Sequence, residues 1–110
     1  MDNKALTTLG LCKRAGKLII GSEKTEYSVR HGGCRFVLVA ADVSEKILEK
    51  YKRLSEETEK TVFVFPDVKM TELASAVGQS GILGVVSTDD AGFSKLLSKK
   101  FSNSYNGGNV

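Results

Sequence analysis

Apolar and polar residues follow one another along the chain with a helical period in some segments and a strand-like pattern in others. In the first segment Leu6, Leu9 and Cys12 recur at the spacing of one helix face. Asp2 or Asn3 stands just ahead of them, where a helix cap is preferred. These positions predict a helix that begins within the first few residues.

The next segment combines a short strand with a second helix. Residues 14–16 end the first helix, and the apolar run 18–20 has strand character. Ser22 is expected to be the N-cap of a helix, with Glu23 in the first turn, where an acidic group suits the helix dipole. Two glycines at 32–33 are a typical C-terminal stop.

The middle of the chain contains two continuous apolar runs. The run 36–41 is apolar at every position, as in a strand covered on both faces. The run 62–65 predicts a second buried strand, which Pro66 ends. Between them Ser44 is expected to cap a third helix. The apolar stripe of that helix consists of Ile47, Leu48, Tyr51 and Leu54.

The last third repeats the alternation of helix and strand. Thr71 followed by Glu72 starts a short helix that closes at Gly78. The run 82–87 predicts a fourth strand. Asp89 or Asp90 is expected to cap a final helix, whose apolar positions are Phe93, Leu96 and Leu97.

Strands that alternate with helices over 110 residues predict one α/β domain, a three-layer α/β/α sandwich around a small mixed four-stranded sheet. Apolar residues make up 41% of the chain and charged residues 26%, as in ordinary globular proteins. We expect this domain to occupy residues 1–101. The polar, Gly- and Asn-rich stretch 102–110 is expected to be a flexible tail.

Neither a membrane span nor a metal-binding framework is predicted. The longest apolar runs fall far short of the ~20 residues that cross a bilayer, and the N-terminus lacks a signal-peptide core, so we expect a cytoplasmic protein without a membrane partner. Cys12 and Cys34 have no zinc-ligand spacing and are expected to be buried thiols.

Charge is unevenly distributed along the chain. Residues 1–36 hold seven basic and three acidic groups, whereas the remainder holds nine basic and ten acidic groups. A positive first third is expected of a protein that binds a polyanion, but solvated charges can also fall unevenly by chance.

The sequence gives little support to an enzyme. His31 is the single histidine and stands at a predicted helix end, where a cation suits the dipole. The stretch 10–17 differs from a phosphate loop in its glycine spacing and in Leu18, where Ser or Thr would hold magnesium. The pair 89–90 is more typical of a helix cap than of a metal site. We expect no catalysis, metal, cofactor or small-molecule substrate.

A basic loop leading into a helix start is the best candidate site. Residues 13–17 carry three cations, and the unpaired N–H groups of a helix beginning near Gly21 suit phosphate. Lys17 and Lys24 add charge, and Tyr27 adds a stacking surface. An exposed helix end with a routine cap remains the alternative.

Four groups of motifs stand out along the chain: 10–21, 30–42 with Ser44, Leu73 to Gly78, and Val85 through Asp89 to Gly92 and Phe93. In their order and spacing they resemble the L-seven-Ae/L-thirty-e ribosomal protein family, most closely its bacterial YlxQ-type members, over about residues 4 to 100. The resemblance implies an α/β/α fold and a binding protein without catalysis. It also implies binding to kink-turn RNA, an asymmetric internal loop whose tandem sheared G·A pairs bend a duplex sharply.

The resemblance also implies which residues contact RNA. Gly21 and Ser22 match the opening of the family's RNA-reading helix. Glu23 stands where Asn is common, Lys24 where Glu or Gln is common, and Tyr27 where Lys is common, so direct reading of the G·A pairs is in question. The other matching positions are Lys17, Asp42, Ser44, Leu48, Gly81, Ile82, Leu83 and Gly84.

The loop 81–84 is expected to pack on the flipped-out nucleotide of the kink, although Ile82 and Leu83 could instead be ordinary strand core. Of the two, Ile82 is expected to face outward. The leading hypothesis is a monomeric, ribosome-associated protein that binds structured RNA, such as a kink-turn in ribosomal RNA. The alternative is a protein-interaction module on the same fold with weakened RNA selectivity.

Overall fold

The computed structural model describes residues 3–102, and within them every predicted element is present. The elements are α1 (Asn3–Arg14), β1 (Ile19–Ile20), α2 (Ser22–Arg30), β2 (Phe36–Val39), α3 (Glu45–Glu57), β3 (Val62–Val64), α4 (Met70–Ala76), β4 (Val85–Thr88) and α5 (Ala91–Ser102). The predicted tail, apart from Ser102, and the candidate cap Asp2 lie outside the described residues.

The four strands form one mixed sheet in the order β1-β4-β2-β3, which confirms the predicted sheet. β2 and β3 are parallel, whereas β4 runs antiparallel to both β1 and β2. All four residues of β2 are buried, as the continuous apolar run predicts for a strand covered on both faces. β3 is an edge strand, and its Val62 is 43% exposed, so the predicted burial of that strand is wrong at its first residue.

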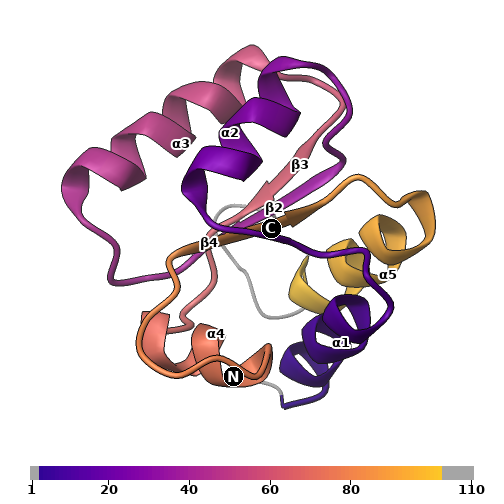
Figure 1. Cartoon of the computed structure of the whole chain (residues 1–110). Coiled ribbons are helices and arrows are strands. Elements are labelled where there is room, and N and C mark those ends of the chain that lie inside the picture. The colour runs from indigo at the N-terminus through magenta and orange to yellow at the C-terminus, as the bar shows by residue number, and fades with distance from the viewer. Residues whose placement is uncertain (1–2, 103–110) are drawn as a thin grey trace.

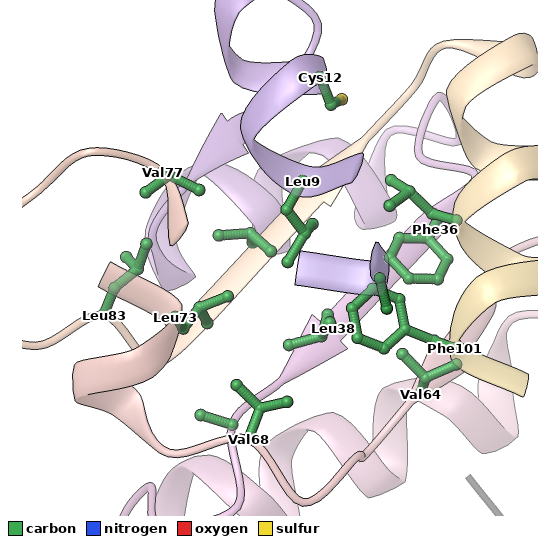
Figure 2. Close-up of a cluster of buried hydrophobic side chains, with 14 of the residues drawn as sticks. Leu9, Cys12, Phe36, Leu38, Val64, Val68, Leu73, Val77, Leu83 and Phe101 are labelled. Carbon is green, nitrogen blue, oxygen red and sulfur yellow. The ribbon is translucent and has the colours of Figure 1, made fainter. Parts of the chain in front are cut away.

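The helices cover both faces of the sheet, which confirms the three-layer sandwich. Figure 1 shows α2 and α3 on one face and α1, α4 and α5 on the other. Side chains of β2 alternate between the two layers: Phe36 and Leu38 join the core under α1, α4 and α5, and Val37 and Val39 join the core under α2 and α3. In Figure 2, Phe36 and Phe101 of α5 lie close together in the larger core, with ring centroids 6.2 Å apart.

Two predicted helix starts differ in the structure. Gly21, not Ser22, is the N-cap of α2, because Gly21 has the non-helical backbone (φ 100°, ψ 159°) and Ser22 is already helical. α4 begins at Met70, one residue before Thr71. There the Glu72 carboxylate accepts a hydrogen bond from the Lys69 N–H at 2.8 Å, so Glu72 closes the N-terminus as expected.

Several strand boundaries and one apolar position also differ. β1 begins at residue 19 instead of 18, β3 ends at residue 64 instead of 65, and β4 ends at residue 88 instead of 87. β4 begins at Val85 instead of residue 82, because residues 82–84 form a loop whose Gly84 carbonyl accepts from the N–H of Ala40, just past β2. β2 ends at Val39, and Ala41 is exposed. Leu96 is 41% exposed, since α5 packs on the core through residues on its other side.

The remaining cap and cysteine predictions are confirmed. Ser44 caps α3 by accepting from the Ile47 N–H at 3.2 Å, and Asp90 caps α5 by accepting from the Phe93 N–H at 2.8 Å. Cys12 and Cys34 are free and buried, and burial raises the pKa of both thiols. No helix within residues 3–102 is long and apolar enough to cross a membrane.

Candidate nucleic-acid interface

The start of α2 is fixed to the sheet by Gly21. Its N–H donates to the carbonyl of Val85 at 2.9 Å, and its positive φ turns the chain from β1 into the helix. Glycine adopts this backbone conformation without the strain that a Cβ would add. The next N–H groups have no acceptor within the helix, as at any helix start. They are therefore available to an anion from outside.

Ser22, the first residue of α2, is hydrogen-bonded to Tyr51 of α3. The Tyr51 hydroxyl donates to the Ser22 carbonyl at 2.9 Å and also lies 2.9 Å from the Ser22 hydroxyl. Because the phenol has one hydrogen, it accepts from Ser22 while it donates to the carbonyl. Tyr51 is fully buried, and burial raises the pKa of its hydroxyl. The start of α2 is thus held against the middle of α3.

Further contacts along α2 prevent it from shifting over the sheet. The hydroxyls of Thr25 and Ser87 lie 2.7 Å apart in the interior. On the outer side, Glu26 pairs with Lys50 of α3 at 3.0 Å and with Arg30 at 2.9 Å. Hydrogen bonds from these two cations lower the pKa of the Glu26 carboxyl. The helix is a rigid element on which exposed side chains have defined positions.

A shallow cleft opens where α2 and α3 begin, and we call it the N-terminal cleft. It is lined by Ser22, Val43, Ser44, Ile47, Met70, Gly84 and Val85. Four segments far apart in the sequence meet here. Gly84 allows the approach, because a Cβ at this position would lie 2.9 Å from Cγ1 of Val43. The cleft combines apolar walls with the hydroxyls of Ser22 and Ser44.

The loop 81–84 enters this cleft at Gly84, and its residues 81–83 lie next to the lining along the chain. Gly81 has a positive φ of 87°, and the two residues after it face opposite environments. Ile82 is 64% exposed, whereas Leu83 is buried in the core near Leu73 (Figure 2). The Leu83 N–H donates to the Met70 carbonyl at 3.1 Å. The expected outward orientation of Ile82 is confirmed, and its contact with RNA stays a prediction.

A second hollow runs along the exposed side of α2, and we call it the α2 hollow. It is lined by Ile19, Lys24, Tyr27, Ser28, His31, Gly33 and Asp89. The rings of Tyr27 and His31 stack with centroids 3.8 Å apart and an interplanar angle of 24°. Nδ1 of His31 also lies 2.8 Å from the Tyr27 carbonyl. Tyr27 is 66% exposed, so the pair offers an aromatic surface to solvent.

The structure brings some predicted site residues together and separates others. Ser22, Ser44 and Gly84 line the N-terminal cleft, and Lys24 and Tyr27 line the α2 hollow. Gly21, Gly81, Ile82 and Leu83 adjoin the cleft residues in the chain. Lys17 is at the other end of β4: its carbonyl accepts from Thr88, whereas Gly21 pairs with Val85.

Three predicted residues contribute in other ways. The Asp42 carboxylate accepts from the Met70 N–H at 2.8 Å, so it fixes the start of α4. Leu48 is half-buried on α3 and does not line the cleft, whereas the preceding residue, Ile47, does. Glu23 is exposed in the first turn of α2.

Nine lining residues are not among the predicted contacts: Ile19, Ser28, His31, Gly33, Val43, Ile47, Met70, Val85 and Asp89. Ile47 belongs to the apolar stripe of α3, and His31 follows Tyr27 by four residues, a spacing that places both on one helix face. The sequence pattern could therefore have identified Ile47 and His31 as lining residues. No local signal marks Val43 or Met70. Within residues 3–102 no three His, Cys, Asp or Glu side chains gather as a metal site would require.

Comparison with known proteins gives a family match along nearly the whole chain. The profile of the ribosomal protein L7Ae/L30e/S12e/Gadd45 family matches residues 3–98. An RNA-binding protein YlxQ from Enterococcus faecium is 36% identical over 93 residues, which cover 84% of this chain and 85% of the relative. The large ribosomal subunit protein eL30 of Candida glabrata is 35% identical over 92 residues, or 81% of this chain and 84% of the relative.

Solved structures share the fold. A protein with unknown function from Bacillus halodurans superposes with a TM-score of 0.83 at 25% identity, covering 92% of this chain and 99% of the other. A 15.5kD RNA binding protein from Giardia lamblia gives a TM-score of 0.72 at 18% identity, covering 91% and 82%. At that identity the second likeness concerns the fold.

Proposed function

The chain belongs to the ribosomal protein L7Ae/L30e/S12e/Gadd45 family, as its motifs indicate, and we propose on this basis that it binds structured RNA. The relatives carry the names of RNA-binding and ribosomal proteins, not of enzymes. The protein therefore acts by holding an RNA shape and catalyses no reaction. Its target class is ribosomal RNA, which it binds as a monomer.

Within this function we propose a kink-turn as the recognised shape. The observation that supports it is the meeting of two helix N-termini and the loop 81–84 around the N-terminal cleft. Helix starts suit phosphates, and a bent RNA presents phosphates close together. The apolar walls of Val43, Ile47 and Met70 suit an extruded base, with exposed Ile82 covering it from the adjoining loop.

The exposed side of α2 would then face the bases next to the bend. Lys24 and the stacked pair of Tyr27 and His31 lie on this side. Lys24 can contact base edges or phosphate, and the aromatic pair can stack on an unpaired base. Glu23 stands at the position where the family commonly has Asn. The contact with the bent RNA therefore depends on shape and stacking more than on hydrogen bonds from a side-chain amide to the G·A pairs.

A gel-shift series tests this function. The probes are a kink-turn duplex, the same RNA with its G·A pairs replaced, and a plain duplex of equal length. We expect the kink-turn to bind most tightly, with binding weakening as salt rises, because phosphate contacts release counterions. Equal affinity for all three would contradict kink-turn recognition. No binding by the folded protein would favour the protein-interaction module.

A further inference from the structure

The two helical layers of the sandwich differ in charge. α1 and α5 lie side by side on the face of the sheet away from α2 and α3 (Figure 1). Together α1 and α5 carry six basic residues and no acidic one: Lys4, Lys13, Arg14, Lys95, Lys99 and Lys100. α2 and α3 carry six basic and six acidic residues. With Glu72 of α4 included, the helices of this layer carry six basic residues and one acidic residue, whereas the charges of the other layer cancel.

These cations lie at the surface. Five of the six are exposed, and Lys100 is half-buried. Lys13, Arg14, Lys99 and Lys100 stand in the last turns of their helices, where cations stabilise the dipole. The dipole accounts for those positions but not for the lack of any acid along both helices, because acids are favourable in first turns. α2 and α3 each have such an acid in the first turn, whereas α1 and α5 have none there, and the acid at the start of α5 is its cap, Asp90.

A groove beside α1 adds polar donors to this face. It lies between α1 and α4 and is lined by Leu6, Thr7, Gly10, Arg14, Thr71, Glu72, Ser75 and Ala76. The two helices approach closely at Gly10, where a Cβ would lie 2.9 Å from the Ala76 carbonyl oxygen. A smaller hollow, lined by Lys13 and Arg14 among others, continues past that point to Gly78.

The groove has the donors that a phosphate needs. Its lining includes the exposed side chains of Thr71 and Ser75 and the guanidinium of Arg14. Hydroxyls and arginine are common partners of phosphate oxygens. Glu72 is the acidic lining residue, and one of its carboxylate oxygens is occupied by the Lys69 N–H. The cations of α1 and α5, together with the donors in the groove, therefore favour the binding of an anion.

We propose that the basic face formed by α1 and α5, with the groove beside α1, binds the phosphates of a second RNA segment. This segment is distinct from the one held at the N-terminal cleft, which lies where α2 and α3 begin. The inference rests on the proposed function in taking RNA as the ligand. The protein then contacts RNA on two faces of a body about 30 Å across and joins two parts of a folded RNA.

The test separates the two faces by neutralising equal numbers of cations. The basic-face variant is Lys13→Gln with Lys95→Gln, and the control is Lys52→Gln with Arg53→Gln on α3, all four residues being exposed. One probe is a kink-turn with arms too short to reach beyond the cleft. The second carries the same kink-turn with duplex arms longer than the 30 Å protein. The dissociation constant is measured as a function of salt for each pair.

For the long RNA we expect the basic-face variant to bind more weakly, with the slope of log K against log salt reduced by about two, one for each phosphate that a removed cation no longer neutralises. The short RNA should bind the variant as it binds the unchanged protein, and the control should behave like the unchanged protein on both. Equal losses on both probes, or no change of slope on the long one, overturn the proposal. An unchanged salt slope on the long RNA would favour an acidic protein, instead of RNA, as the partner of this face.

The proposed function can fail separately. If the unchanged protein shows no preference for a kink-turn, yet the basic-face variant loses two units of salt slope on a long plain duplex, the basic face stands and kink-turn recognition does not. If kink-turn preference is present and the variant keeps the full slope on the long probe, the basic face is wrong. A circular-dichroism melt of each variant excludes unfolding as the cause.

Discussion

The phenol of Tyr51 hydrogen-bonds to Ser22 twice, donating to its carbonyl and accepting from its hydroxyl, each at 2.9 Å. This contact joins residues 29 positions apart and connects the interior of α3 to the first turn of α2. Ser22 also lines the N-terminal cleft. The position of Ser22 in the lining of the cleft therefore depends on the hydroxyl of Tyr51, which is buried in the core.

Tyr51→Phe should destabilise the fold by about 1–3 kcal/mol, because the Ser22 carbonyl loses its side-chain donor and the Ser22 hydroxyl loses its acceptor in a partly buried place. RNA affinity should fall as well, since the start of α2 is no longer held against α3. Denaturant unfolding and gel shifts measure the two effects. Ser22→Ala is the matched control and should cost less, because the Tyr51 hydroxyl still reaches the carbonyl. A phenylalanine variant as stable as the unchanged protein would contradict this role for the hydroxyl.

Gly21→Ala should destabilise the protein by about 1–3 kcal/mol, because its φ of 100° and ψ of 159° are accessible almost exclusively to glycine. Nothing lies within 4 Å of a Cβ at this position, so the loss would come from the backbone alone. Gly33→Ala is the control, since a Cβ there also meets nothing and its φ is not positive. That change should be neutral or stabilising by up to about 1 kcal/mol. Equal denaturation midpoints for both variants would show that Gly21 tolerates a side chain.

The order and type of the elements could be predicted because each has its own period. Phe36, Leu38, Val37 and Val39 sit in one uninterrupted apolar run and are divided between the two cores. Ser22 shows where local rules fail. A serine after glycine is a good cap by composition, but its hydroxyl is taken by Tyr51 from a distant helix, so Gly21 caps in its place.

The site is only partly predictable for the same reason. Lys17 is close in sequence to the start of α2, which favours placing the two together, yet β1 separates them and Lys17 lies by Thr88. Val43 and Met70 meet in the cleft through the order of the strands, which no local pattern encodes. Ile82 and Leu83 face opposite ways as expected, but through the turn at Gly81, because β4 does not begin until Val85.

Tyr27→Ala should weaken RNA binding by about 1–3 kcal/mol if its ring stacks on a base, with little loss of stability because the side chain is 66% exposed. Tyr27→Phe keeps the ring and should bind like the unchanged protein. Fluorescence anisotropy with a labelled kink-turn gives both affinities. Were the phenylalanine variant as weak as the alanine one, the hydroxyl and not the ring would be the contact.

The Glu26 cluster predicts a pH dependence of stability. Hydrogen bonds from Lys50 and Arg30 lower the pKa of Glu26, so the folded state favours the carboxylate. Its contribution is present above the unfolded pKa of about 4.3 and is lost as pH falls through the lower folded value. Glu26→Gln should therefore cost under about 1 kcal/mol at pH 7, since the cluster lies at the surface and is screened by solvent. The stabilities of the two proteins should converge in acid, once pH has fallen below the lowered folded pKa of Glu26, and a gap that widened in acid would have the wrong sign.

The loop 81–84 allows stability and binding to be separated in two neighbouring residues. Leu83 is buried among the core residues under α4, so Leu83→Ala should destabilise the fold by about 2–5 kcal/mol, the usual range for a large-to-small core change. Ile82 is 64% exposed in the loop that enters the cleft at Gly84, so Ile82→Ala should leave the denaturation midpoint nearly unchanged. If its side chain covers an extruded base, the same variant should lose on the order of 1 kcal/mol of kink-turn affinity, less than an aromatic platform provides.

The plain duplex has no extruded base and should bind Ile82→Ala as it binds the unchanged protein, which makes it the control RNA. A folded Ile82→Ala protein with full kink-turn affinity would remove this loop from the interface and leave recognition to the starts of α2 and α3.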